Sequence, residues 1–90
     1  MINGKTKSGF EFELEDDALN DMELLEDLAK IDEGGKESIV GMPKVLVRLL
    51  GEDGKQRLYN HVRNEKGRVT VDAVLAEFED VLNASKTLKN

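Results

Sequence analysis

The chain has 90 residues, no cysteine and a formal net charge of −6. This length predicts one domain with a modest core, and the lack of cysteine excludes disulfides and cysteine-ligated metals. No apolar run approaches the roughly 18 residues of a membrane span, and the opening MINGKTKSG lacks the apolar region of a signal peptide. The composition predicts a soluble cytosolic protein that has no membrane partner.

The acidic charge is concentrated in one segment. Residues 11–33 carry eleven acidic side chains and one lysine, whereas residues 1–10 and residues 34–90 each carry a net charge of +2. Binding to a nucleic-acid backbone needs a clustered basic surface, so this distribution argues against a nucleic-acid partner. It fits a soluble protein, or one whose partner has a basic face.

A β-hairpin is predicted over residues 1–15. In FEFEL, residues 10–14, apolar and acidic residues alternate, which is the two-residue period of a strand with one buried face. Residues 1–6 can pair with that strand, and the glycine in residues 7–9 suits the turn between them.

The first predicted helix covers about residues 18–32. Its apolar residues recur at spacings of three and four, and either Asp16 or Asp17 is the expected N-cap. The glycine pair within residues 33–36 is expected to end it.

Two further helices are predicted on either side of Gly51. Residues 37–50 are densely apolar and should supply the core, with the main helix starting near Met42, followed by proline. Gly51 is the expected C-cap, and residues 52–64 form the next helix.

The last predicted helix begins after a turn at residues 65–67. Thr70 is its expected N-cap, and the apolar residues between 71 and 82 form a clear helical stripe. Residues 86–90 are expected to be a flexible tail. The predicted fold class is therefore α+β, mostly α. It is a single domain over residues 1–85, with an N-terminal β-hairpin and about four short helices over residues 16–85.

The stretch 49–69 holds the only histidine, His61, and raises the question of catalysis. A catalytic histidine needs an orienting carboxylate and usually a nucleophile. No cysteine is present, and Ser8, Ser38 and Ser85 fall in a turn, near a helix start and in the tail. We expect His61 to be a half-exposed helix residue and predict no catalytic residue.

No metal or cofactor site is predicted either. One histidine without cysteine cannot form a closed zinc site, and the acidic run lacks the glycine of a calcium-binding loop. The glycines do not have the spacing of a phosphate-binding loop. The protein is therefore expected not to be an enzyme.

A binding surface for another protein is the favoured interpretation. A small chain with dense apolar helices is prone to leave an apolar stripe uncovered, which invites self-association or a partner. Flexible methionines and leucines suit adaptable interfaces. The predicted partner-binding residues are Met22, Leu25, Met42, Leu46, Leu49, Leu50 and Tyr59.

The sequence also resembles a known family. FEFEL, the acidic stretch leading into DMELLEDLAKID, and MPKVLVRLLGEDGKQRLYNHVRNEKGRVTVDAVLAEF look like the small tail assembly chaperones of long-tailed, siphovirus-type bacteriophages of Gram-positive bacteria. That family has a motif of the type LLG-[DE]-x-x-x-x-L-x-x-H-hydrophobic-R-x-x-x-G-R-hydrophobic. Its counterparts here are Leu49, Leu50, Gly51, Glu52, Leu58, His61, Val62, Arg63, Gly67, Arg68 and Val69. This chain has one more residue between Glu52 and Leu58, and the resemblance spans about residues 10–82.

The resemblance implies a non-enzymatic role in phage tail morphogenesis. Such chaperones bind and solubilise the tape-measure protein, recruit tail-tube subunits, act in the cytoplasm of the bacterial host and are absent from the mature virion. Many also exist in a longer, frameshifted form. The implied partners are the tape-measure protein and tail-tube subunits, and a homo-oligomer is compatible with the apolar helices.

An alternative function from another class remains open. An acidic regulatory or inhibitory protein, either a DNA mimic or antitoxin-like, would direct residues 11–33 at a basic partner. Such binding is salt-sensitive, whereas apolar client binding is not. An acyl carrier role is less favoured, because Ser38 lies in Glu-Ser-Ile rather than Asp-Ser-Leu.

Overall fold

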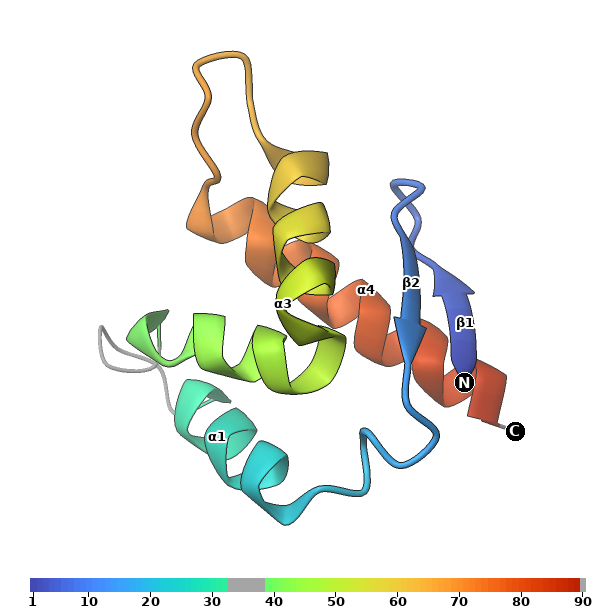
Figure 1. The fold of residues 1–90 in the computed structure, drawn as a ribbon. Coiled ribbons are helices and arrows are strands. Elements are labelled where there is room, and N and C mark those ends of the chain that lie inside the picture. Colours follow the sequence, from blue (N-terminus) through green and yellow to red (C-terminus); the bar gives the residue numbers. More distant parts are fainter. Residues whose placement is uncertain (33–38, 90) are drawn as a thin grey trace.

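A β-hairpin precedes three helices in the computed structural model, which describes residues 1–32 and 39–89 (Figure 1). The predicted α+β, mostly helical class is confirmed. The expected helix end at residues 33–36 and Ser38 lie outside the described residues. The elements are β1 (Ile2–Lys5), β2 (Glu11–Leu14), α1 (Met22–Asp32), α3 (Met42–Val62) and α4 (Val71–Lys89).

The hairpin has the predicted turn. β1 and β2 pair antiparallel, with Ile2 opposite Leu14 and Lys5 opposite Glu11. Gly9 has a φ of 97°, which side chains other than glycine rarely adopt, and its N–H donates to the Thr6 carbonyl at 3.0 Å. The alternation in FEFEL therefore gave both the strand and its buried face.

The start of α1 differs from the prediction. The N-cap is Asp21, whose Oδ1 accepts the N–H groups of the second and third residues after it, at 3.0 and 3.3 Å. Neither Asp16 nor Asp17 caps the helix, because residues 15–20 form turns closed by their own backbone hydrogen bonds. In a segment so rich in aspartate, residue type alone does not select the cap.

The expected count of about four helices is wrong, because two of them are one element. The helices predicted on either side of Gly51 both belong to α3, which ends at Val62 rather than at residue 64. Gly51 alone leaves the helical conformation, with φ 81° and ψ 168°, so α3 bends without a connecting loop. The bend brings the two halves close. A Cβ on Gly54 would lie 2.7 Å from the Leu50 Cβ.

The last helix begins as predicted and ends later. Thr70 Oγ1 accepts the Ala73 N–H at 3.3 Å, which confirms the N-cap. Helix α4 continues past the apolar stripe of residues 71–82 to Lys89, within the segment predicted as a tail. No glycine or proline follows Thr70 that could end the helix. Near its end, the Ser85 hydroxyl donates to the Val81 carbonyl at 2.7 Å.

The core lies where the hairpin and the three helices meet. In Figure 1, α4 runs behind α3 and the hairpin, β2 stands between β1 and α3, and α1 lies along the first half of α3. The buried apolar side chains form one cluster: Phe10, Phe12, Leu14, Leu24, Met42, Val45, Leu46, Leu49, Leu58, Val74, Phe78 and Val81.

Candidate functional site

The structure divides the predicted partner-binding residues between surface and core. Met22 and Leu25 on α1 are 70% and 50% exposed. Met42, Leu46 and Leu49 on α3 are instead buried members of the core. This corrects the prediction, because side chains that fill the core cannot contact a partner while the protein stays folded.

Leu50 and Tyr59 are also poor surface residues. Both are partly buried and pack against the core cluster. The Tyr59 ring is further covered by Lys55, whose Nζ lies 5.8 Å from the ring centroid. Of the seven predicted residues, Met22 and Leu25 are therefore the two that are exposed.

Helix α1 has apolar side chains on two faces. Leu24 is buried and Leu28 is partly buried against the core. Met22, Leu25 and Ala29 are exposed, and their spacing of three and four residues places them on one side of the helix. We call these three residues the outer face of α1. The outer face therefore gives α1 a small apolar strip on its solvent side.

A second exposed apolar pair lies just before α3 and was not predicted from the sequence. Ile39 and Val40, just before α3, are exposed. Residues 37–50 are densely apolar and predict a core segment, so this pair was expected to be buried. A dense apolar run does not indicate which of its residues are covered.

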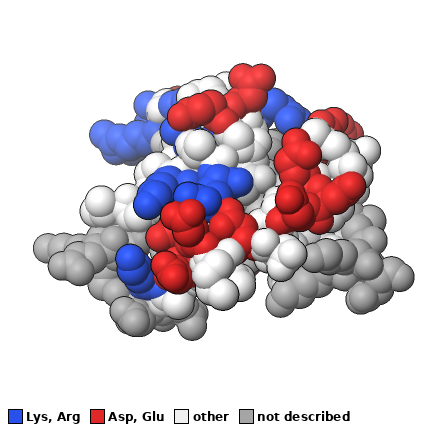
Figure 2. All heavy atoms as spheres, turned by 60° about the horizontal axis from the view of Figure 1, so that its bottom comes forward, with Lys and Arg blue, Asp and Glu red and all other residues white. Residues whose placement is uncertain are grey.

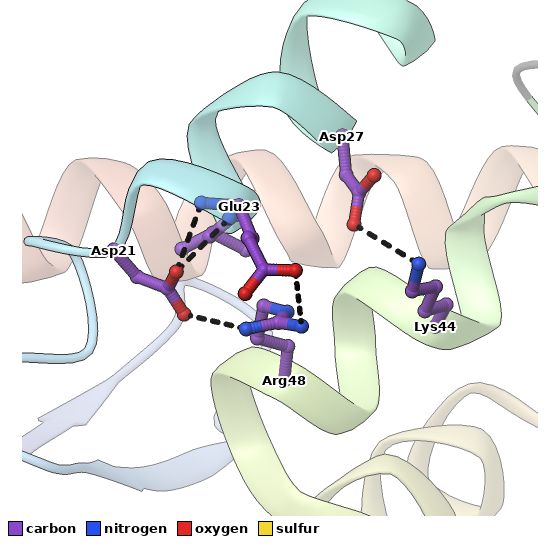
Figure 3. A network of polar contacts seen from close by, with 6 residues as sticks. Asp21, Glu23, Asp27, Lys44 and Arg48 are labelled. Carbon is purple, nitrogen blue, oxygen red and sulfur yellow. Dashed lines mark hydrogen bonds and ion pairs between the residues drawn. The ribbon is translucent and has the colours of Figure 1, made fainter.

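A network of charged side chains joins α1 to α3 (Figure 3). Arg48 Nη1 donates to Asp21 Oδ2 at 3.0 Å, and Arg48 Nη2 lies 3.6 Å from Glu23 Oε2. Lys44 Nζ is 4.0 Å from Asp27 Oδ2, an ion pair too long for a hydrogen bond. The network attaches the start of α1 to α3 beside the outer face.

This network also changes the proton affinity of its members. The hydrogen bond from Arg48 lowers the pKa of Asp21 below 3.8, and the backbone N–H groups that Asp21 caps lower it further. The same bond raises the pKa of the Arg48 guanidinium. Asp21 is therefore both the helix cap and the anion that holds Arg48.

The surface around α1 is mixed in charge. Figure 2 shows acidic side chains gathered on this side of the molecule, with basic side chains lying against them. The pairs are Asp21 and Glu23 with Arg48, Asp27 with Lys44, and Asp16 with the N-terminal amino group at 2.8 Å. Part of the acidic segment is therefore neutralised within the chain.

A second polar network joins the hairpin turn to α3 and α4. The Thr6 and Ser8 hydroxyls both donate to Glu77 Oε1, at 2.7 and 2.8 Å. Ser8 Oγ also lies 2.9 Å from His61 Nε2, and the His61 ring packs against Phe10 with centroids 5.5 Å apart. Glu77 and Thr6 are buried. Sequence reasoning missed this site, because its members are far apart in the chain and no local pattern relates them.

The hydrogen bonds of this network do not fit nucleophilic catalysis. Ser8 has one hydroxyl proton, which it donates to Glu77. The Ser8 oxygen therefore accepts a hydrogen bond from a protonated His61 Nε2. A serine nucleophile needs the opposite arrangement, in which the histidine accepts the serine proton. We interpret the network as a tie that holds the hairpin turn in place.

The motif residues in 49–69 also have structural roles. Leu58 is fully buried, and Gly51 makes the bend in α3. Arg63 Nη1 donates to the Gly67 carbonyl at 2.9 Å, and Gly67 has a φ of 83°, as the predicted turn requires. These residues therefore determine the course of α3 and of the turn that leads to α4.

Neither a metal site nor a membrane span is found in the described part of the chain. There, no group of three or more histidine, aspartate or glutamate side chains could hold a metal ion. No helix within residues 1–32 and 39–89 is long and apolar enough to cross a bilayer.

Comparisons with protein-family models, curated proteins and solved structures give no significant match.

Proposed function

We propose that the protein is a non-enzymatic tail assembly chaperone of a long-tailed bacteriophage, and that it binds the tape-measure protein and keeps it soluble during tail morphogenesis. The motif in residues 49–69 supports the family. The observation that carries the activity is the outer face of α1, where Met22 and Leu25 are 70% and 50% exposed.

The chemistry of this face suits a helical client. An apolar strip on one helix can cover the apolar strip of another, and flexible methionine and leucine side chains adapt to different sequences. Glu23 and Glu26 are exposed beside the strip and keep the complex hydrated. Met22 and Leu25 are already partly covered, so burying the rest of both side chains contributes about 2–4 kcal/mol before the cost of association, and each contact is weak. Weak contacts allow release, as expected of a protein that is absent from the virion.

The rest of the proposal follows from the same role. The protein acts in the host cytoplasm, recruits tail-tube subunits to the coated tape-measure protein, and coats a long client with several copies. No nucleic acid, membrane, metal or cofactor takes part.

Co-expression with the tape-measure protein tests the proposal. Wild-type protein should raise the soluble fraction of the tape-measure protein, and the double variant Met22→Ser, Leu25→Ser should not, because it removes the apolar strip. Val71→Ser is the matched control, since Val71 is 46% exposed on a different helix. Equal performance of the double variant and wild type would place client binding elsewhere, and no effect of wild type would remove the main support.

The alternative is an acidic regulatory protein that uses residues 11–33 against a basic target. The ion pairs of Asp16, Asp21 and Glu23 count against it, because those carboxylates already have partners. The two functions differ in salt dependence. At about 1 M salt the screening length is about 3 Å, so mimicry should be lost while apolar client binding persists.

A further inference from the structure

The outer edge of strand β2 presents unpaired main-chain groups. The Thr6 N–H donates to the Phe10 carbonyl at 2.9 Å, which identifies that pair as hydrogen-bonded. Hydrogen-bonded pairs alternate along an antiparallel ladder, so the next one is Gly4 with Phe12. The N–H and C=O groups of Glu11 and Glu13 consequently point away from β1.

Helix α3 lies beside this edge and occupies only part of it. In Figure 1, β2 stands between β1 and α3. Arg57 of α3 donates from Nη2 to the Glu11 carbonyl at 2.8 Å. Within the described residues, the outward main-chain groups of Glu13 have no hydrogen-bonding partner. An edge of this kind is a template for a further strand.

A groove of about 360 Å³ runs along the edge from Phe10 to Glu15. Its opposite wall is the bend of α3, where Gly51 and Gly54 contribute no side chains. A Cβ placed on Gly51 would meet no atom within 4 Å. The bend therefore leaves open space opposite the strand.

The charges around the groove select the occupant. Glu13, Glu15 and Asp53 line it and form no ion pair with any residue that the structure describes. The cations that also line it are already engaged: Arg48 pairs with Asp21, the N-terminal amino group pairs with Asp16, and Arg57 donates to the Glu11 carbonyl. A second copy is disfavoured, because antiparallel pairing of two β2 strands would set glutamates opposite one another. Strand β1 shows the complementary arrangement, with Lys5 opposite Glu11.

We infer that the outer edge of β2 binds an extended segment of a partner protein by strand addition. The segment carries lysine or arginine at every second position, opposite the glutamates, and apolar side chains between them that enter the groove. Main-chain hydrogen bonds to Glu13 hold it. This site lies apart from the outer face of α1 and does not depend on the chaperone role.

The test uses an acetylated and amidated heptapeptide of alternating lysine and valine, with lysine at both ends. Binding should appear in amide NMR spectra and should slow hydrogen exchange of the Glu13 N–H by about tenfold or more at saturation. A control peptide has the same sequence with the main-chain nitrogens of its lysines methylated. It keeps every side-chain charge but has no main-chain N–H to donate to β2, so it should bind at least about fivefold more weakly.

Protein variants locate the site. Glu13→Lys should weaken binding about tenfold or more, because it places like charges opposite each other. Glu79→Lys makes the same charge change at an exposed position of α4 and should bind nearly as wild type. Equal binding of the N-methylated peptide would overturn strand addition. Equal loss in the two variants would overturn the location, and no binding of the unmodified peptide, or dimerisation of the protein through β2, would overturn the proposal.

Discussion

The two halves of α3 are attached to their neighbours by different chemistry. The half before Gly51 joins α1 through the side-chain ion pairs of Arg48 and Lys44. The half after Gly51 joins the hairpin through Arg57, which donates to a main-chain carbonyl, and through His61, which contacts Ser8 and Phe10.

This difference separates the responses of the two regions to solvent. Ion pairs at the surface are screened by salt and lost in acid, whereas a hydrogen bond to a main-chain carbonyl and a ring contact are screened much less. Helix α1 carries the outer face proposed to bind clients. Its attachment should therefore be adjustable under conditions in which the hairpin stays in place.

The largest expected effect is that of Leu58→Asp in the second half. Leu58 is fully buried, so the variant would lose apolar contacts and enclose an unpaired carboxylate. We expect a loss of more than about 4 kcal/mol and an unfolded protein by circular dichroism. Gln56→Asp, at an exposed position of the same half, should remain folded. A folded Leu58→Asp protein would contradict the placement of this half in the core.

Glu77→Ala tests the tie between the hairpin turn and α4, which also holds Ser8 against His61 of the second half. The hydroxyls of Thr6 and Ser8 would lose their shared acceptor, at an expected cost of about 2–3 kcal/mol in urea unfolding. Hairpin amides should exchange faster while those of α1 change little. Glu79→Ala, exposed on the same helix, is the control and should cost little. If both variants lose the same stability, the tie is not what holds the turn.

Gly54→Ala tests the contact between the halves. In an ordinary helix the change would stabilise by up to about 1 kcal/mol. Here the new Cβ would lie 2.7 Å from the Leu50 Cβ, so we expect a loss of about 1–3 kcal/mol instead. Thermal unfolding shows whether Gly54→Ala raises or lowers the stability. Asp53→Ala, at the exposed neighbouring position, is the control. Stabilisation of Gly54→Ala would mean that the halves are not in close contact.

Arg48→Ala should have the smallest effect on the global stability of the protein, and its effect should be confined to α1. Removing the exposed guanidinium frees Asp21 and Glu23, so α1 amides should exchange faster while hairpin amides do not change. Adding salt to wild type should reproduce the difference, since the pairs are screened. A variant indistinguishable from wild type at low salt would show that these pairs do not hold α1.

Lowering the pH should also weaken the attachment of α1 to α3. The pKa of Asp21 is lower in the folded state than its ordinary value of 3.8, so the ionised form is favoured by folding. Its contribution is complete above the unfolded pKa and is lost as pH falls through the folded pKa. The protection of α1 amides, taken relative to the intrinsic exchange rate at each pH, should therefore fall below about pH 4, and Asp21→Asn should remove that dependence.

The sequence predicted those parts of the fold that depend on local pattern. The FEFEL alternation, the turn at Gly9 and the cap at Thr70 each follow from a few adjacent residues. The cap of α1 did not follow, because several aspartates offered equivalent side chains and the choice depends on the turns before Asp21. The helix count failed because nothing local shows whether Gly51 begins a loop or a bend.

The candidate site was harder to predict than the fold. A helical stripe shows that a face is apolar, but burial depends on which elements cover it. Met42, Leu46 and Leu49 therefore entered the predicted surface, although they are core residues. His61 was expected to be a half-exposed helix residue, and no local pattern showed that the fold brings Ser8 to it and Glu77 to Ser8, from opposite ends of the chain.

The half-buried Tyr59 makes the second half of α3 visible to spectroscopy. The chain has one tyrosine and no tryptophan, so its near-ultraviolet emission comes almost entirely from this ring. The ring packs against the core beside Lys55. Fluorescence of the unlabelled protein thus follows one place on the second half of α3, and detachment of α1 would pass unseen unless a label were placed there.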